Sequence, residues 1–164
     1  MKLEGQCAVP VDLLLLMTSL YADGNQCYVE TANIDGETNL KLKEAPSAIK
    51  AIIAEDGLPR ENIFRGHLEF EPPNKNIHNF IGALHLDAVP DPIPLGANNL
   101  LLRSSLFSNT EWGYGVAVYC GQETKIQMNN RHAPSKMSKI EGYVNKAIIL
   151  IFYAQVRSPI LYFS

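Results

Sequence analysis

The chain has 164 residues, of which 46% are hydrophobic and 19% charged, and a formal net charge of −3. This length suits one domain with its own core, and the hydrophobic content excludes a long disordered chain. The slight negative charge gives no support to a nucleic-acid binder. The three cysteines form no Cys-x-x-Cys pair, which favours a reducing compartment. A chain of this length could contain only part of a large multidomain protein.

The first half of the chain is predicted to form strands joined by tight turns. Residues 11–17 form a short apolar run, which suits a buried strand. Residues 26–31 alternate, with Cys27 and Val29 on one face. Because residues 22–25 form a turn signal between these runs, we expect the two strands to pair as a β-hairpin.

The middle of the chain combines one helix with a strand and an irregular segment. Residues 47–55 are predicted to be helical, because Ser47 can cap the helix and three isoleucines follow at helical spacing. Residues 79–87 are predicted to form a strand. Residues 87–99 are rich in Pro and Gly, so we expect no regular structure there.

Two further strands and a short helix are expected next. The strands cover residues 100–102 and 112–120, and the helix covers residues 123–129. In the longer strand the large side chains fall on one face and the other face is nearly bare; the large ones are Trp112, Tyr114, Val116 and Val118. The glycine pair on the bare face, Gly113 and Gly115, predicts close packing rather than a nucleotide site.

The last segment is the most apolar. Residues 147–154 are continuously hydrophobic, but Gln155, Arg157 and Pro159 interrupt the run before it reaches the roughly 20 residues of a membrane span. A basic stretch precedes it: Arg131, Lys136, Lys139 and Lys146, against the single acid Glu141. That excess is typical of the cytoplasmic flank of a membrane segment. A core helix with a solvated basic flank explains the same residues and is slightly favoured by this segment alone.

Metal and nucleotide motifs are absent from the sequence. The four histidines lie apart from one another and form no His-x-x-x-His pair, so we expect surface or core positions rather than metal ligands: His67, His78, His85 and His132. There is no phosphate-binding loop that ends in Gly-Lys-Ser/Thr.

The most informative segment is residues 33–41, Asn-Ile-Asp-Gly-Glu-Thr-Asn-Leu-Lys. Taken alone, Asp35-Gly36 is a common hairpin turn. In its longer context, residues 27–41 closely resemble the actuator-domain signature of the type IV P-type ATPases, the lipid flippases. Further blocks match in the same order: residues 9–16, 94–103, 109–112 and 136–141. Ser104 departs from the pattern, because the family usually has Gly there.

The resemblance implies a mainly β fold with small helices (α+β), the distorted β-roll of a P-type ATPase actuator domain, followed by the start of a transmembrane helix. Residues 1–130 would be the actuator domain without its N-terminal strands. Residues 131–142 would be a basic cytoplasmic linker. Residues 143–164 would start the membrane helix, which is disrupted or truncated.

The resemblance also implies a function. The chain would be a fragment of an ATP-driven phospholipid flippase, inactive by itself. Glu37 would align the water that hydrolyses an aspartyl phosphate located outside the fragment. Asp35, Gly36 and Thr38 would shape the loop that carries Glu37.

Cofactors and partners follow from the same resemblance. The intact protein would use ATP and Mg²⁺, with no cofactor or metal bound by the fragment. Its partners would be the phospholipid substrate, the remaining domains of the same chain and an accessory subunit, but no nucleic acid. We expect a membrane protein with this domain on the cytoplasmic side. Two alternatives remain open: a regulatory or lipid-sensing module fused to another enzyme, and a non-catalytic β-domain.

Overall fold

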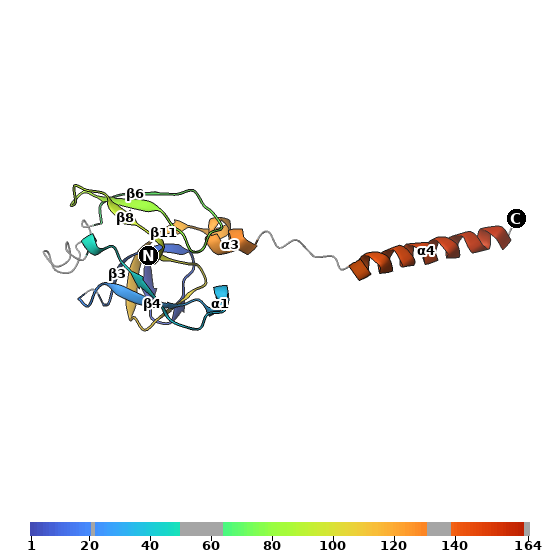
Figure 1. Ribbon diagram of the computed structural model, residues 1–164, viewed down its shortest axis with the longest axis horizontal. Helices are drawn as coiled ribbons and strands as arrows, with labels where there is room; N and C mark the ends of the chain where they lie inside the picture. The colour runs from blue at the N-terminus through green and yellow to red at the C-terminus, as the bar shows by residue number, and fades with distance from the viewer. Residues whose placement is uncertain (21, 50–63, 131–138, 163–164) are drawn as a thin grey trace. The chain divides into compact units, whose positions relative to one another are not determined.

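The computed structural model describes residues 1–20, 22–49, 64–130 and 139–162. The chain divides into two compact units, Met1–His132 and Ala133–Ser164. The first unit consists mainly of antiparallel strands with a few short helices (Figure 1). This architecture confirms the mainly β prediction.

The first sheet has the order β1-β11-β3-β9. Its strands are β1 (Lys2–Glu4), β11 (Trp112–Tyr119), β3 (Asp12–Thr18) and β9 (Leu100–Leu101). Every residue of β3 is buried, which confirms the buried strand predicted from its apolar run. Because β3 is covered on both faces, it shows no polar alternation.

The second sheet has the order β2-β10-β4-β5 and contains β2 (Cys7–Ala8), β10 (Leu106–Ser108), β4 (Gln26–Glu30) and β5 (Lys41–Glu44). Its core face carries the alternating Cys27 and Val29, as predicted. The predicted hairpin between residues 11–17 and 26–31 is wrong, however, because β3 and β4 belong to different sheets.

The side chain of Asn25 explains why that hairpin does not form. Its amide oxygen accepts the backbone N–H of Thr18 at 2.8 Å, and its amide nitrogen donates to the carbonyl of Leu16 at 3.1 Å. These bonds occupy backbone groups that a neighbouring hairpin strand would otherwise use. The chain therefore leaves the first sheet at this turn, and β4 enters the second.

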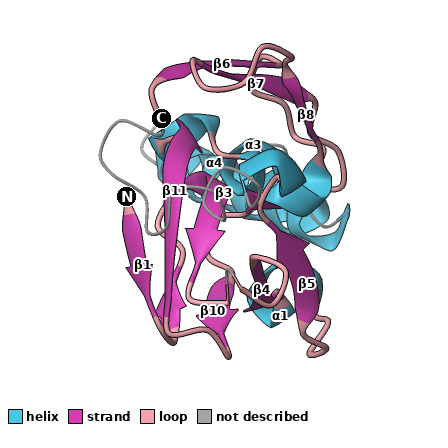
Figure 2. Cartoon of the chain, turned by 90° about the vertical axis from the view of Figure 1, so that its left-hand side faces the viewer, coloured by secondary structure: helices cyan, strands magenta, loops and turns pink. Residues whose placement is uncertain are grey.

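The third sheet, β6-β7-β8, lies at the top of Figures 1 and 2, away from α1 (Ala32–Asp35). Its strands are β6 (Gly66–Phe70), β7 (Gly82–Leu86) and β8 (Ile93–Leu95). The prediction that residues 87–99 lack regular structure is wrong for β8. Pro94 is tolerated because β8 is an edge strand with one row of backbone groups outside the ladder.

The glycine pair of β11 lies where the first sheet is most crowded. A Cβ atom at Gly115 would stand 2.4 Å from the carbonyl oxygen of Leu14, so the predicted close packing is confirmed. The opposite face of β11, which carries the large side chains, is only partly buried, since Tyr114 and Val116 are both exposed. Register shifts after Tyr114 and Ala117 also interrupt the simple alternation expected for this strand.

Short helical segments close the first unit. Residues 47–49 are helical and Ile49 is buried, but the rest of the helix predicted to residue 55 lies outside the described residues. Two 3₁₀ turns, η1 (Ala97–Asn99) and η2 (Gly121–Glu123), precede β9 and α3. The helix α3 (Lys125–Asn130) corresponds to the one predicted over residues 123–129.

Ser104 has a left-handed backbone, with a φ of 68°. This conformation suits glycine, which is the usual residue at this position in the type IV P-type ATPases that the sequence resembles. The backbone N–H of Ser104 donates to the carbonyl of Val9 at 2.8 Å, and Ser105 N–H donates to Leu102. These bonds hold the turn despite the less favourable side chain.

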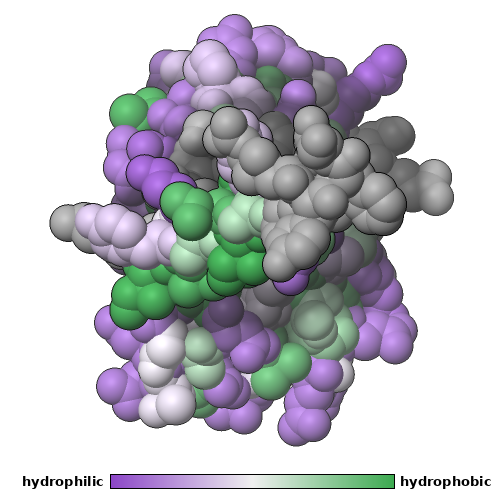
Figure 3. Space-filling view, turned by 90° about the vertical axis from the view of Figure 1, so that its right-hand side faces the viewer, coloured by the Kyte–Doolittle hydropathy of each residue, from purple (hydrophilic) through white to green (hydrophobic). Residues whose placement is uncertain are grey.

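The second unit contains the helix α4 (Lys139–Tyr162). The backbone stays helical past Arg157 and Pro159, where the sequence interrupts the apolar run. A proline removes one helical hydrogen bond but does not always end the helix. Ile148 to Tyr153 are all exposed. Figure 3, seen from the right-hand side of Figure 1, shows a band of hydrophobic side chains across the middle of the view, with mostly hydrophilic side chains above and below it. Among the described residues, no helix combines the length and apolarity needed to cross a membrane.

Candidate functional site

The loop that carries the predicted site connects β4 to β5. These strands pair antiparallel, with Val29 opposite Lys41, and α1 forms a single turn between them. Gly36 ends that turn with a φ of 77°, and its N–H donates to the carbonyl of Ala32 at 3.1 Å. Asp35-Gly36 is therefore the end of a helical turn and not a two-residue hairpin. The αL conformation, rather than lack of space, calls for glycine here.

Asp35 is the centre of the hydrogen bonds in this loop. Its carboxylate accepts the Thr31 hydroxyl at 2.9 Å, the backbone N–H of Glu37 at 3.0 Å and the Lys41 ammonium at 2.5 Å. The bond from Lys41, followed by the bond from the Glu37 N–H, lowers the pKa of Asp35 to about 2. The bond from Asp35 also raises the pKa of Lys41. The Asp35 carboxylate is thus ionised at neutral pH, and its hydrogen bonds hold the loop in this shape.

Glu37 projects from the same loop into solvent. Its side chain is 61% exposed, and its Oε2 lies 3.0 Å from Nζ of Lys41. Lys41 therefore bridges Asp35 and Glu37. Thr38 is exposed as well, and the described residues include no hydrogen-bond partner for its side chain. The structure brings the carboxylates of Asp35 and Glu37 together at Lys41 and places Gly36 at the end of the helical turn between them, while Thr38 stands apart.

A cavity of about 170 Å³ lies beside this loop, with Asp35, Lys41 and Lys43 among its lining residues. The Lys43 ammonium donates to the carbonyl of Ala97 at 2.6 Å, which ties β5 to η1. Burial lowers the pKa of Lys43. Lys41 and Lys43 thus bring two positive charges to the lining of this cavity, beside the Asp35 carboxylate.

A second polar network, which the sequence did not reveal, lies inside the first unit. The fully buried Asp12 accepts the backbone N–H of Arg103 at 2.8 Å and that of Lys125 at 2.7 Å. Burial raises the pKa of Asp12, although these two hydrogen bonds oppose the shift. The only available signal was an acidic residue at the start of an apolar run. This carboxylate joins three distant segments of the chain.

The buried side chain of Lys125 extends the network. Its ammonium contacts Glu71 Oε1 at 3.2 Å and Asn74 Oδ1 at 2.9 Å, and lies 5.5 Å from the centre of the Tyr119 ring. The Tyr119 hydroxyl donates to the carbonyl of Glu71 at 2.6 Å. These contacts attach the loop before β7 to α3 and β11. Because the carboxylate of Asp12 is shielded from solvent, we assign this network to stabilising the fold rather than to chemistry.

The histidines are not all isolated, which corrects the prediction from spacing. His67 on β6 stands directly opposite His85 on β7, and their rings stack with centroids 4.4 Å apart. Eighteen positions separate the two in sequence, so only the pairing of the strands brings them together. His78 is exposed and lies outside this pair.

Comparison with known proteins gives one consistent result. The phospholipid-transporting ATPase 10 of Arabidopsis thaliana is 43% identical over 143 residues, 87% of this chain. The phospholipid-transporting ATPase C887.12 of Schizosaccharomyces pombe is 35% identical over 150 residues, 92% of this chain. This chain is homologous to one segment of the phospholipid-transporting ATPases. The homology confirms the resemblance to type IV P-type ATPases noted in the sequence.

The match to these ATPases extends over most of the chain but little of the relatives. A further relative, the probable phospholipid-transporting ATPase 7 of Arabidopsis thaliana, is 40% identical over 151 residues, which are 92% of the chain and 12% of that protein. The chain spans 11% to 12% of the curated relatives named here. No protein-family model matches it.

Proposed function

We propose that this chain is the actuator-domain portion of an ATP-driven phospholipid flippase, with Glu37 as the residue that aligns the hydrolytic water. The observation that carries the proposal is an exposed glutamate on a loop held by Asp35 and Lys41, within a segment homologous to phospholipid-transporting ATPases. The aspartate that receives the phosphoryl group would lie elsewhere in the intact protein.

The chemistry needs a carboxylate that can reach a partner domain. A phosphoryl transfer through an aspartyl phosphate divides hydrolysis into two steps, and the second step needs a water in line with phosphorus. A glutamate can orient that water and accept its proton. Glu37 is 61% exposed, so its carboxylate is available to a surface that approaches the loop.

Lys41 gives a physical reason why such an approach is tolerable. A carboxylate and a phosphate repel each other, and the repulsion grows as water leaves the space between them. The Lys41 ammonium is within 3.0 Å of both the Glu37 and Asp35 carboxylates, and so offsets part of their negative charge. We therefore assign Lys41 as a positioning residue. A motion of the domains would bring the carboxylate to the phosphate against the remaining repulsion, and would couple hydrolysis to transport.

The proposal also covers the intact protein. ATP and Mg²⁺ would bind to its other domains, the phospholipid would pass through membrane helices, and an accessory subunit would be a further partner. The present domain would face the cytoplasm, next to the basic residues 131–142 and the helix that follows. In this arrangement the chain contributes dephosphorylation, and the other domains contribute phosphorylation and transport.

Phosphoenzyme decay in the intact protein tests the proposal. Glu37→Gln keeps the size of the side chain but removes the proton acceptor, so the phosphoenzyme should decay about 10² to 10⁴ times more slowly after a chase with unlabelled ATP. Glu111→Gln, on an exposed glutamate outside the loop, is the matched control and should decay at the parent rate. Parent-like decay of Glu37→Gln would remove Glu37 from the mechanism.

A further inference from the structure

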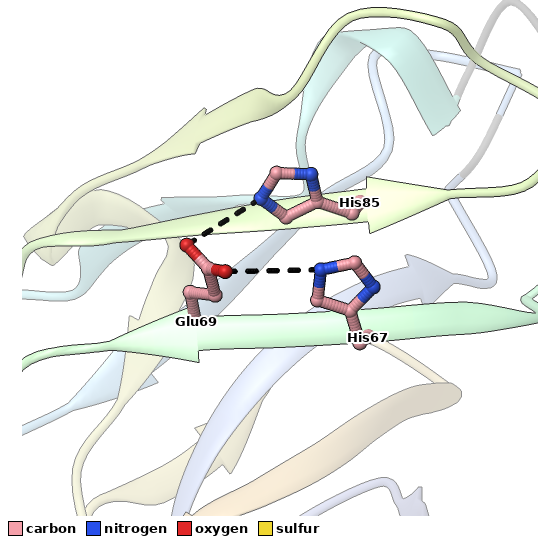
Figure 4. Close-up of side chains that lie close together, drawn as sticks. All are labelled: His67, Glu69 and His85. Carbon is pink, nitrogen blue, oxygen red and sulfur yellow. Dashed lines mark ion pairs between the residues drawn. The ribbon is translucent and has the colours of Figure 1, made fainter.

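Three side chains with metal-binding atoms meet on one face of the third sheet. His67 and Glu69 are two residues apart on β6, so they project from the same face, and His85 occupies the position of β7 opposite His67. Figure 4 shows the Glu69 carboxylate facing both imidazole rings. We call these three residues the His–Glu cluster. Its ligand atoms lie within 4.8 Å of one another.

The distances in the cluster are close to those of a metal site. The two oxygens of Glu69 lie 3.8 Å from Nε2 of His67 and 3.7 Å from Nε2 of His85. In a tetrahedral zinc site with bonds near 2.0–2.1 Å, neighbouring ligand atoms are about 3.3 Å apart. Inward movements of about 1 Å per atom would close the cluster round an ion. The side chains of His67 and Glu69 are 66% and 69% exposed, so they have room to make that adjustment.

His85 supplies a second observation. Its Nε2 atom is shielded from solvent and has no hydrogen-bond partner among the described residues. The nearest carboxylate oxygen, at 3.7 Å, is too distant for a hydrogen bond. Buried polar atoms without a partner are uncommon and costly. An ion between this nitrogen and Glu69 would satisfy it.

The donor set selects the kind of ion. Two imidazole nitrogens and one carboxylate oxygen suit Zn²⁺ and similar transition metals, whereas Ca²⁺ and Mg²⁺ prefer oxygen ligands alone. We infer that His67, Glu69 and His85 bind one divalent transition-metal ion of the zinc class, with water as a fourth ligand. The exposure of His67 and Glu69 leaves that fourth position open to solvent.

The site is separate from the proposed catalytic loop. In both Figure 1 and Figure 2 the sheet that carries the His–Glu cluster lies at the top, and α1 lies below. The ion would join β6 to β7 across the strand pair. Its expected effect is therefore on the stability of the third sheet, through preferential binding to the folded state.

Metal titration of the 164-residue chain tests the inference. The chain, stripped of metal and kept in mild detergent because α4 exposes hydrophobic side chains, should bind one Zn²⁺ by calorimetry and melt at a higher temperature with Zn²⁺. Substitution with Co²⁺ should give the visible bands of a tetrahedral site without a thiolate charge-transfer band. Absence of stoichiometric Zn²⁺ binding would overturn the inference.

Variants locate the ion. His85→Ala should weaken Zn²⁺ binding by at least about 100-fold, since loss of even a supporting partner costs about 10- to 100-fold. His67→Ala, at a more exposed position, should do the same if His85→Ala does not fold. His78→Ala and Cys120→Ser, on exposed residues outside the cluster, should bind like the parent chain. Binding that survives both cluster variants, or is lost in Cys120→Ser, would place the ion elsewhere and overturn the inference.

Discussion

Two clusters of the same composition, two carboxylates and one lysine each, differ in their surroundings: Asp12 and Lys125 are fully buried, whereas Glu37 is 61% exposed. The buried cluster consists of Asp12, Glu71 and Lys125, and the loop cluster of Asp35, Glu37 and Lys41. In the buried cluster, Asp12 receives N–H groups 91 and 113 positions away in sequence. In the loop cluster, Asp35 receives groups at most six positions away. The first joins distant parts of the fold, and the second shapes one loop.

The pKa values of the two aspartates are shifted in opposite directions. Burial raises the pKa of Asp12, whereas the hydrogen bond from Lys41 lowers that of Asp35 to about 2. Desolvation outweighs the hydrogen bonds at Asp12, and the hydrogen bonds outweigh desolvation at Asp35. The comparison teaches that a residue type alone does not indicate its role. Mutations can test this difference by their effects on stability.

The largest expected effect on stability comes from Asp12. Asp12→Ala would leave two N–H groups without their acceptor, so we expect the free energy of unfolding to fall by about 2–4 kcal/mol. Urea unfolding followed by circular dichroism measures the loss. Asp35→Ala is the matched control in the loop cluster, where water can replace the carboxylate and the loss should be clearly smaller. Equal losses of unfolding free energy would contradict the proposal that Asp12 stabilises the whole fold whereas Asp35 shapes only its loop.

The next largest effect is expected at Gly115, beside the buried strand β3. Gly115→Ala would place a methyl group 2.4 Å from a backbone oxygen and 2.7 Å from the Leu13 side chain. Because backbone cannot move aside easily, we expect a loss of about 1–3 kcal/mol, measured by the same unfolding experiment. Stability unchanged from the parent would mean that β3 and β11 can separate at little cost.

Gly36 provides the corresponding test in the loop. Gly36→Ala meets no neighbouring atom within 4 Å, but its φ of 77° strains any residue with a Cβ. We expect a loss of about 1 kcal/mol, less than at Gly115. In backbone NMR spectra, changes should be limited to residues 31–41. Spectral changes throughout the second sheet would show that the loop conformation is coupled to the core.

The smallest effect is a change of one ionisation. Because the pKa of Asp35 is lowered to about 2, its contribution to stability is present above its unfolded pKa and is lost as pH falls toward 2. Lys41→Met removes the main cause, so the pKa of Asp35 should return toward the ordinary value of about 3.9. A carboxyl-carbon NMR titration of both chains measures this. An unchanged Asp35 pKa in Lys41→Met would show that the backbone N–H of Glu37 dominates instead.

Local patterns were the more reliable predictors of structure. The apolar run at β3, the alternation of β4 and the helical pattern near α3 all correspond to observed elements. The hairpin and the irregular segment were predicted wrongly because strand pairing depends on hydrogen bonds of particular backbone groups, which side-chain periodicity does not record. Asn25 redirects the chain after β3, and β8 finds its partner in β7. Neither event leaves a periodic signal.

The sequence by itself determined the mainly β fold and the resemblance of the loop around Glu37 to the lipid flippases, because both depend on residues close together in the chain. Only the tertiary structure decided which side chains meet across strands. It placed Asp12 against the N–H of Lys125 and His67 opposite His85. These contacts follow from strand register and burial, in which a shift of one residue turns each side chain to the other face of its sheet.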